Sequence, residues 1–141
     1  MQNLKKSVML GLVAVFGAAL AIAPAHAQSR VAADIPFNFV LGKTTMQAGQ
    51  YRIARSGASF VAVSAVEGKT RFAMLLPGGD SHSQNGQPYL VFTRYGQETF
   101  LSKVVFSENE VYDVPVSSRE KEMRAHLTSG EQLAVLIQPV R

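Results

Sequence analysis

A two-residue alternation of apolar and polar side chains is the feature that most constrains how this chain folds. Residues 35–41 read IPFNFVL, with apolar side chains at every second position: Ile35, Phe37, Phe39 and Leu41. Successive side chains of a β-strand point to opposite faces, so this pattern predicts a strand with one face in a core. The alternation resumes at Tyr51 after two turns, and we therefore expect a hairpin that begins a sheet.

Comparable patterns recur through the rest of the chain. The strands expected from them span residues 51–55, 59–66, 70–76, 89–95, 99–106, 111–116 and 132–140. Short turns containing glycine separate several of these segments, as in antiparallel hairpins. Residues 77–88, PGGDSHSQNGQP, have no apolar period and form a loop longer than most hairpin connections.

The period changes at residues 118–127, SREKEMRAHL, which contain no glycine, proline or β-branched residue. Ser117 and Glu120 have the spacing of a capping box, and Gly130 stands where a helix would stop. We expect an all-β fold: an antiparallel β-sandwich or small β-barrel of about seven to nine strands, with one short amphipathic helix before the last strand. No linker or repeat divides the chain, so residues 28–141 are interpreted as a single β-domain.

The N-terminus has the pattern of a secretory signal peptide that covers residues 1–27. Two lysines precede an uncharged apolar run at residues 8–23, and a proline ends that run. Small residues at Ala25 and Ala27 suit signal peptidase and predict cleavage before Gln28. The run is near the lower length for spanning a bilayer, so an uncleaved membrane anchor is the alternative. Cleavage would place the mature chain in the periplasm or the medium, with no membrane contact afterwards.

The charge balance argues against a nucleic-acid partner. The chain has 14 basic and 10 acidic side chains, and removing the two lysines of the signal peptide leaves 12 against 10, a net charge of +2. These basic side chains are scattered, whereas nucleic-acid binding needs a clustered basic face. The chain contains no cysteine, so its stability must come from an apolar core rather than from disulfides.

Few residues suit metal binding or catalysis. Asp80 and His82 lie close together in the loop, but a tight metal site needs three or four ligands. His126 lies on the expected helix and is interpreted as facing solvent or capping its last turn. No serine lies in a Gly-x-Ser-x-Gly motif, and no P-loop pattern occurs. We therefore expect no catalytic residue, no metal ligand and no cofactor.

Three acidic residues after the second hairpin could serve a hydrolase and are the exception to this lack of catalytic candidates: Glu108, Glu110 and Asp113. Two carboxylates that face each other across a cleft can hydrolyse a glycosidic bond. We interpret these three as part of an exposed connection and keep a hydrolase as an alternative.

The aromatic residues lie almost entirely on expected strands, and most are expected in the core. They are Phe37, Phe39, Tyr51, Phe60, Phe72, Tyr89, Phe92, Tyr95, Phe100, Phe106 and Tyr112. If the fold is a barrel, some of these rings would instead line a pocket for an apolar ligand.

Residues 33–53, ADIPFNFVLGKTTMQAGQYRI, resemble the start of a group of small exported bacterial proteins. That group opens with Ala-Asp-Ile-Pro-Phe-x-Phe and a glycine turn, followed by Leu-Pro-Ala-Gly-x-Tyr; here Gln47 replaces the proline. The hairpin VFTRYGQETFLSKV and the segment SSREKEM are similar as well. The resemblance implies an exported β-domain and brings no known activity with it.

Together these patterns favour an exported, non-enzymatic binding or structural protein of the cell envelope. Its partner would be a protein or a small molecule that the sequence does not identify. A barrel that carries a small apolar ligand and the hydrolase are the two alternatives.

Overall fold

The computed structural model describes residues 30–79, 86–127 and 129–139. The elements within these residues are, in chain order, β1 (Arg30–Ile35), β2 (Phe39–Leu41), β3 (Thr44–Met46), β4 (Gly49–Ser56), β5 (Phe60–Ala65), β6 (Thr70–Met74), β7 (Leu76–Pro77), β8 (Tyr89–Tyr95), β9 (Glu98–Ser107), β10 (Glu110–Asp113), α1 (Ser118–His126), β11 (Glu131–Leu136) and β12 (Gln138–Pro139).

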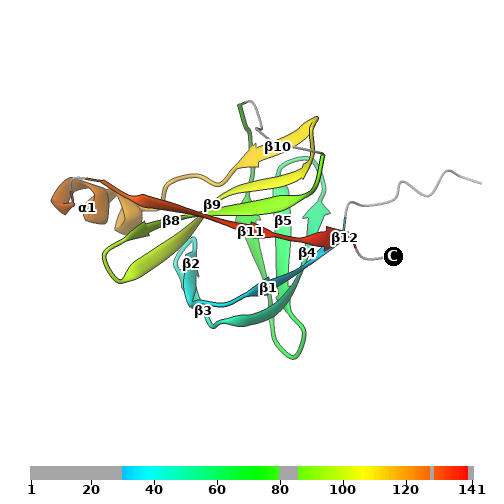
Figure 1. Ribbon diagram of the computed structural model, residues 1–141, viewed down its shortest axis with the longest axis horizontal. Helices are drawn as coiled ribbons and strands as arrows, with labels where there is room; N and C mark the ends of the chain where they lie inside the picture. The colour runs from blue at the N-terminus through cyan, green and yellow to red at the C-terminus, as the bar shows by residue number, and fades with distance from the viewer. Residues whose placement is uncertain (1–29, 80–85, 128, 140–141) are drawn as a thin grey trace, which may run out of the picture.

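The strands form two curled sheets around a shared core (Figure 1). One sheet has the order β12-β1-β4-β5-β6; the other has the order β11-β8-β9-β10-β7 and gains β2 and β3 through β9. The pairing of β2 with β9 is parallel, and the other described pairings are antiparallel. The expected all-β class with one short helix near the end is confirmed. The strands outnumber the expected seven to nine because three expected strands are each divided in two and β3 is added.

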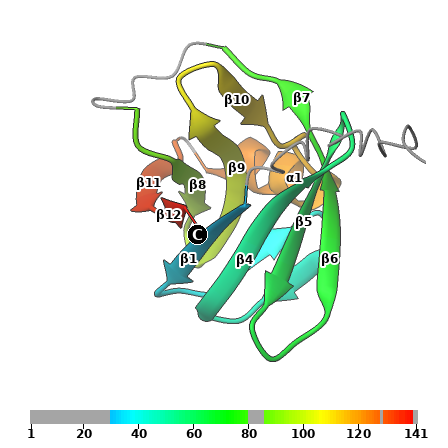
Figure 2. The ribbon, with the colours of Figure 1, turned by 90° about the vertical axis from the view of Figure 1, so that its right-hand side faces the viewer.

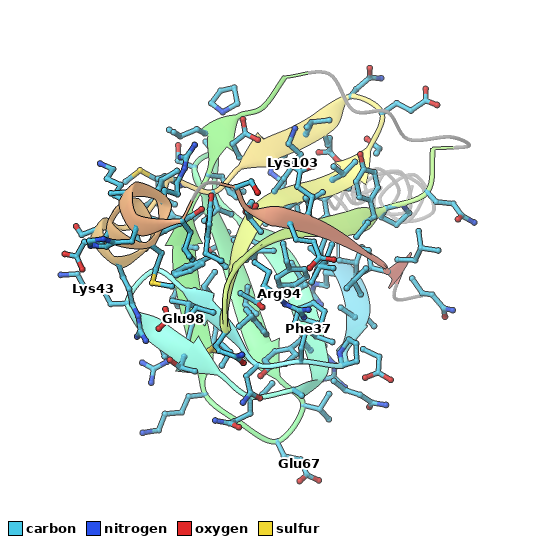
Figure 3. All side chains as sticks on the ribbon, turned by 60° about the vertical axis from the view of Figure 1, so that its left-hand side comes forward. Phe37, Lys43, Glu67, Arg94, Glu98 and Lys103 are labelled. Carbon is cyan, nitrogen blue, oxygen red and sulfur yellow. The ribbon has the colours of Figure 1, made fainter. Side chains whose placement is uncertain are left out.

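Aromatic rings fill the space between the two sheets. Phe92 is fully buried and meets Phe37 and Phe39 edge-on, with ring centroids 5.0 and 5.3 Å apart. Phe39 also meets Tyr51, at 5.4 Å. The guanidinium of Arg94 lies 5.6 Å from the Phe37 ring centroid and covers it from outside (Figure 3). These edge-to-face contacts join β2, β4 and β8 and confirm that most of the expected aromatic residues are core residues.

The opening alternation does not form the expected single strand. The chain leaves β1 after Ile35, because Pro36 lacks a backbone donor, and β2 begins only at Phe39. β1 pairs with β4 along six residue pairs, whereas β2 pairs with β3 and with β9 in the other sheet. The expected hairpin is therefore corrected: one apolar pattern contributes to both sheets.

The expected last strand is divided in the same way. β11 pairs with β8, and β12 pairs with β1 in the other sheet. Ile137 separates them; its side chain is buried in the core and its backbone N–H donates to Pro88 O at 3.2 Å. Figure 1 shows the chain passing from β11 into β12 between the sheets. The C-terminal segment therefore joins the two sheets at one edge.

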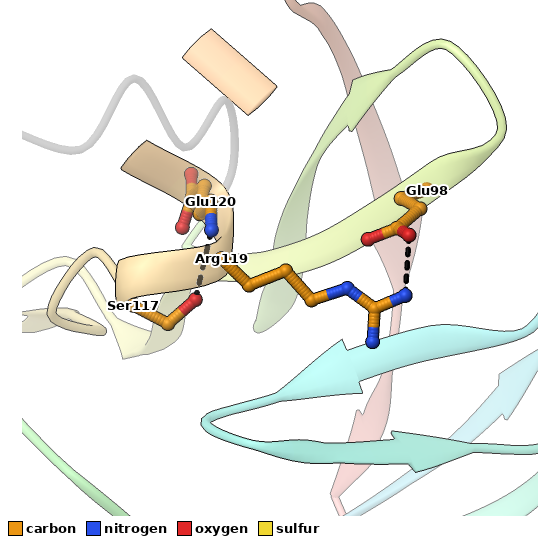
Figure 4. A network of polar contacts seen from close by, with 4 residues as sticks. All are labelled: Glu98, Ser117, Arg119 and Glu120. Carbon is orange, nitrogen blue, oxygen red and sulfur yellow. Dashed lines mark hydrogen bonds and ion pairs between the residues drawn. The ribbon is translucent and has the colours of Figure 1, made fainter. Parts of the chain in front are cut away.

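The helix confirms the predicted capping box. Ser117 Oγ accepts the backbone N–H of Glu120 at 3.2 Å (Figure 4). A hydrogen bond from the Ser117 backbone favours the charged form of the Glu120 carboxyl. Burial raises the pKa of the Glu120 carboxyl, while Arg124 one turn later and the Ser117 hydrogen bond oppose that shift. Arg119 reaches from the helix to Glu98 at the start of β9.

The predicted helix stop at Gly130 is wrong. α1 ends at His126, with Leu127 already extended, and His126 is exposed to solvent. A Cβ at Gly130 would lie 2.6 Å from Thr93 Cγ2 and 2.7 Å from Tyr95 Cε1. Glycine is favoured there because the side chains of Thr93 and Tyr95 occupy the space that a Cβ would need.

Candidate binding face

The five-stranded sheet has one side in the core and one side, here called the outer face, that points away from it. Two aromatic residues expected in the core lie on this outer face: Phe60, which is 45% exposed, and Phe72, which is 62% exposed. Met74 beside them is 51% exposed. The expectation that these two rings fill the core is therefore wrong, and large apolar side chains gathered on a surface are typical of an interaction site.

The strand register brings these three side chains together. Phe60 is opposite Met74 across the β5–β6 pair, and Ala62 is opposite Phe72. Val61 and Val63, which alternate with them on β5, are fully buried on the core side. Each strand thus has apolar residues on both faces, which is why alternation alone did not indicate the exposed side.

β6 is also an open edge of the sheet, as Figure 2 shows. Leu75 donates its backbone N–H to Ser59 O at 2.7 Å, so Ala73 and Arg71, at alternate positions, also direct their backbone groups toward β5. The backbone N–H and C=O groups of Phe72 and Met74 therefore point to the open side. A row of such groups is a template for another strand.

The centre of the outer face is shallow because its side chains are small. Ala54, Ala62 and Ser64 line a hollow of about 400 Å³ whose rim includes Arg30 and Arg52. A second hollow of about 500 Å³ also includes Arg52 and is bordered by the exposed Val66 and Leu136. The outer face is thus a low floor of small residues with charged and apolar margins, where Arg30 and Arg52 are joined by Asp34.

The three candidate hydrolase acids do not form a facing pair in the described contacts. Glu110 Oε1 binds Arg55 Nη1 at 2.9 Å, and Asp113 Oδ1 lies 3.6 Å from Lys103 Nζ. Glu108 lies near Gly86, with its Oε1 3.6 Å from where a Cβ would stand. Two of the three carboxylates therefore belong to separate ion pairs with different strands.

Asp80 and His82 fall outside the described residues, as do the cleavage-site residues Ala25, Ala27 and Gln28. Within the described part of the chain, no group of three or more histidine or acidic side chains is placed to hold a metal ion. The same residues include no helix with the length and apolar character that crossing a membrane requires.

Comparison of the chain with family models, with curated proteins and with solved structures gives no match.

Proposed function

We propose that this chain is an exported, non-enzymatic binding protein of the cell envelope that takes up an extended segment of a partner protein along β6. The observation that carries the proposal is the coincidence of exposed apolar side chains, Phe72 and Met74, with outward-directed backbone groups on the same strand. Backbone hydrogen bonds would supply affinity, and the alternating side chains would supply specificity.

Charge indicates the kind of segment that fits. β4, β5 and β6 contain no acidic residue and three arginines, of which Arg55 is paired with Glu110 on β10 and Arg52 and Arg71 are exposed. On β6 itself the exposed Arg71 points to the opposite side from Phe72. A segment added to β6 would therefore match it with apolar side chains beside Phe72 and acidic side chains beside Arg71.

A second copy of this chain matches less well. Pairing β6 with its own copy about Phe72 would bring two Arg71 side chains to the same side of the joined sheet. Each Arg71 would then face Ala73 of the copy rather than an opposite charge, whereas an acidic residue placed opposite Arg71 is attracted to it, so an acidic partner segment is favoured over self-association.

A synthetic peptide in which valine and glutamate alternate would test the binding site. We expect saturable shifts of the β6 backbone amide signals in an NMR titration of the mature protein. Phe72→Asp should remove binding, and Arg71→Glu should reverse the preference toward a matched valine–lysine peptide. Lys43→Glu, in the turn between β2 and β3, is the control and should bind as the unchanged protein does (Figure 3).

Equal binding of the acidic and basic peptides, or shifts confined to other strands, would contradict the docking proposal. The export part has a separate test, since it depends on residues 1–27. Cell fractionation with intact-mass analysis should give a mature chain that begins at Gln28 outside the cytoplasm. Recovery of the full-length chain in the cytoplasm would refute export without bearing on the β6 site.

A further inference from the structure

A third hollow, which is polar, lies on the other sheet, between α1 and the strands it faces. Its volume is about 390 Å³, within the range of small-molecule sites. The lining residues used below come from five elements, β8, β9, β10, α1 and β11: Thr93, Ser102, Asp113, Glu120, Arg124 and Gln132. The sites on the two sheets therefore involve different residues.

A β-bulge supplies a pair of hydroxyls to this hollow. Val91 is opposite Lys103 and Phe92 is opposite Leu101, which leaves Ser102 as the extra residue of β9. Ser102 Oγ lies 2.6 Å from Thr93 Oγ1. Each hydroxyl can donate one hydrogen and accept two, so the pair keeps acceptor capacity beyond their mutual bond.

The charged side chains of the hollow balance each other. Asp113 pairs with Lys103, and Glu120 interacts with Arg124 along the helix. An anion would meet two carboxylates and a cation would meet an arginine, so neither sign of charge is favoured. The lining nevertheless offers hydrogen-bond donors and acceptors together, including the amide of Gln132.

We propose that this hollow binds a neutral polyhydroxylated ligand of the size of a mono- or disaccharide. Such a ligand presents both donors and acceptors on one small frame, as the lining does. The proposal stands apart from the β6 site and does not depend on it.

The test is an NMR titration of the mature protein with glucose, glucosamine and glucuronate, which differ in charge. We expect saturable shifts of the Thr93, Ser102 and Gln132 amides with glucose and weaker binding of both charged sugars. Thr93→Val, which keeps the side-chain shape, should weaken glucose binding by about tenfold because one hydroxyl partner is lost. Gln50→Ala, on the outer face, is the control and should leave the glucose affinity unchanged.

Three results would overturn the proposal. One is the lack of any saturable shift at these amides with glucose. Another is tighter binding of a charged sugar. The third is an unchanged glucose affinity in a Thr93→Val protein whose spectrum shows that it is folded. A double variant, Thr93→Val with Gln132→Ala, tests whether both side chains belong to the binding site. It should bind glucose more weakly than either single variant.

Discussion

At the scale of single residues, Arg55 shows how a partly exposed side chain can link the two sheets. It extends from β4 to Glu110 on β10 at 2.9 Å, and its guanidinium lies 5.0 Å from the ring centroid of Tyr112. Both charged side chains are about one-third exposed, so solvent weakens the ion pair but does not remove the contact with the ring.

We therefore expect Arg55→Ala to lower the free energy of unfolding by about 1 kcal/mol, measured by urea denaturation. Arg55→Lys keeps the charge, so its free energy of unfolding should lie between those of Arg55→Ala and the unchanged protein. Arg52→Ala on the outer face is the control, and an equal loss in that variant would show that Arg55 has no special role.

Gly130 gives a sharper residue-scale prediction. A methyl group there would overlap Thr93 and Tyr95, so Gly130→Ala should destabilise the fold by about 1–3 kcal/mol through strain on β8. Gly79→Ala is the matched control, because nothing lies within 4 Å of its Cβ position and unfolding should change little. The thermal midpoints of the two variants are compared: equal midpoints would mean that the side chains of Thr93 and Tyr95 move aside at little cost.

At the scale of the element, α1 contains a carboxyl group whose protonation is coupled to folding. Burial raises the pKa of Glu120 in the folded state, so the folded chain binds a proton more readily than the unfolded chain does. Stability from this group therefore rises as the pH falls through the raised pKa and is lost as the pH increases.

Glu120→Gln keeps an acceptor for the Ser117 backbone but cannot ionise. Urea denaturation from about pH 4 to neutral should show a flatter profile for this variant, with the largest gain over the unchanged protein at the neutral end. Glu122→Gln, exposed on the same helix, should leave the profile in place. Parallel profiles for Glu120→Gln and the unchanged protein would show that folding does not change the pKa of the Glu120 carboxyl.

Sequence patterns predicted where the strands and the helix lie better than they predicted which strands pair with each other. Alternation located β5, β8 and β9, and the Ser117–Glu120 spacing located the start of α1, because both signals depend on neighbours along the chain. The division of the first apolar pattern between two sheets was missed, since alternation tells which side chains share a face but not which strand lies alongside. Phe72 was misplaced for a related reason: β6 has apolar side chains on both faces, and alternation does not tell which face the other sheet covers.

At the scale of the whole molecule, one large core cluster joins the two sheets without a disulfide. Val61 and Val63 of β5 and Leu90 and Phe92 of β8 belong to one cluster of buried side chains. The same cluster includes Ile137, at the point where the chain passes from one sheet to the other. A smaller cluster that includes Phe100 lies within the second sheet, but the larger one spans both sheets, so the two should unfold together.

Ile137→Ala tests that cooperativity. Truncating this buried side chain should lower the free energy of unfolding by about 2–5 kcal/mol and shift both sheets by the same amount. Native-state hydrogen exchange can follow the two sheets separately, through the amides of Val63 in one and Leu90 in the other. Equal loss of protection at both positions is expected because one core stabilises both. If Leu90 kept its protection while Val63 lost it, the two sheets would unfold as independent units. The C-terminal strands that pass between them would then make only local contacts and would not belong to the common core.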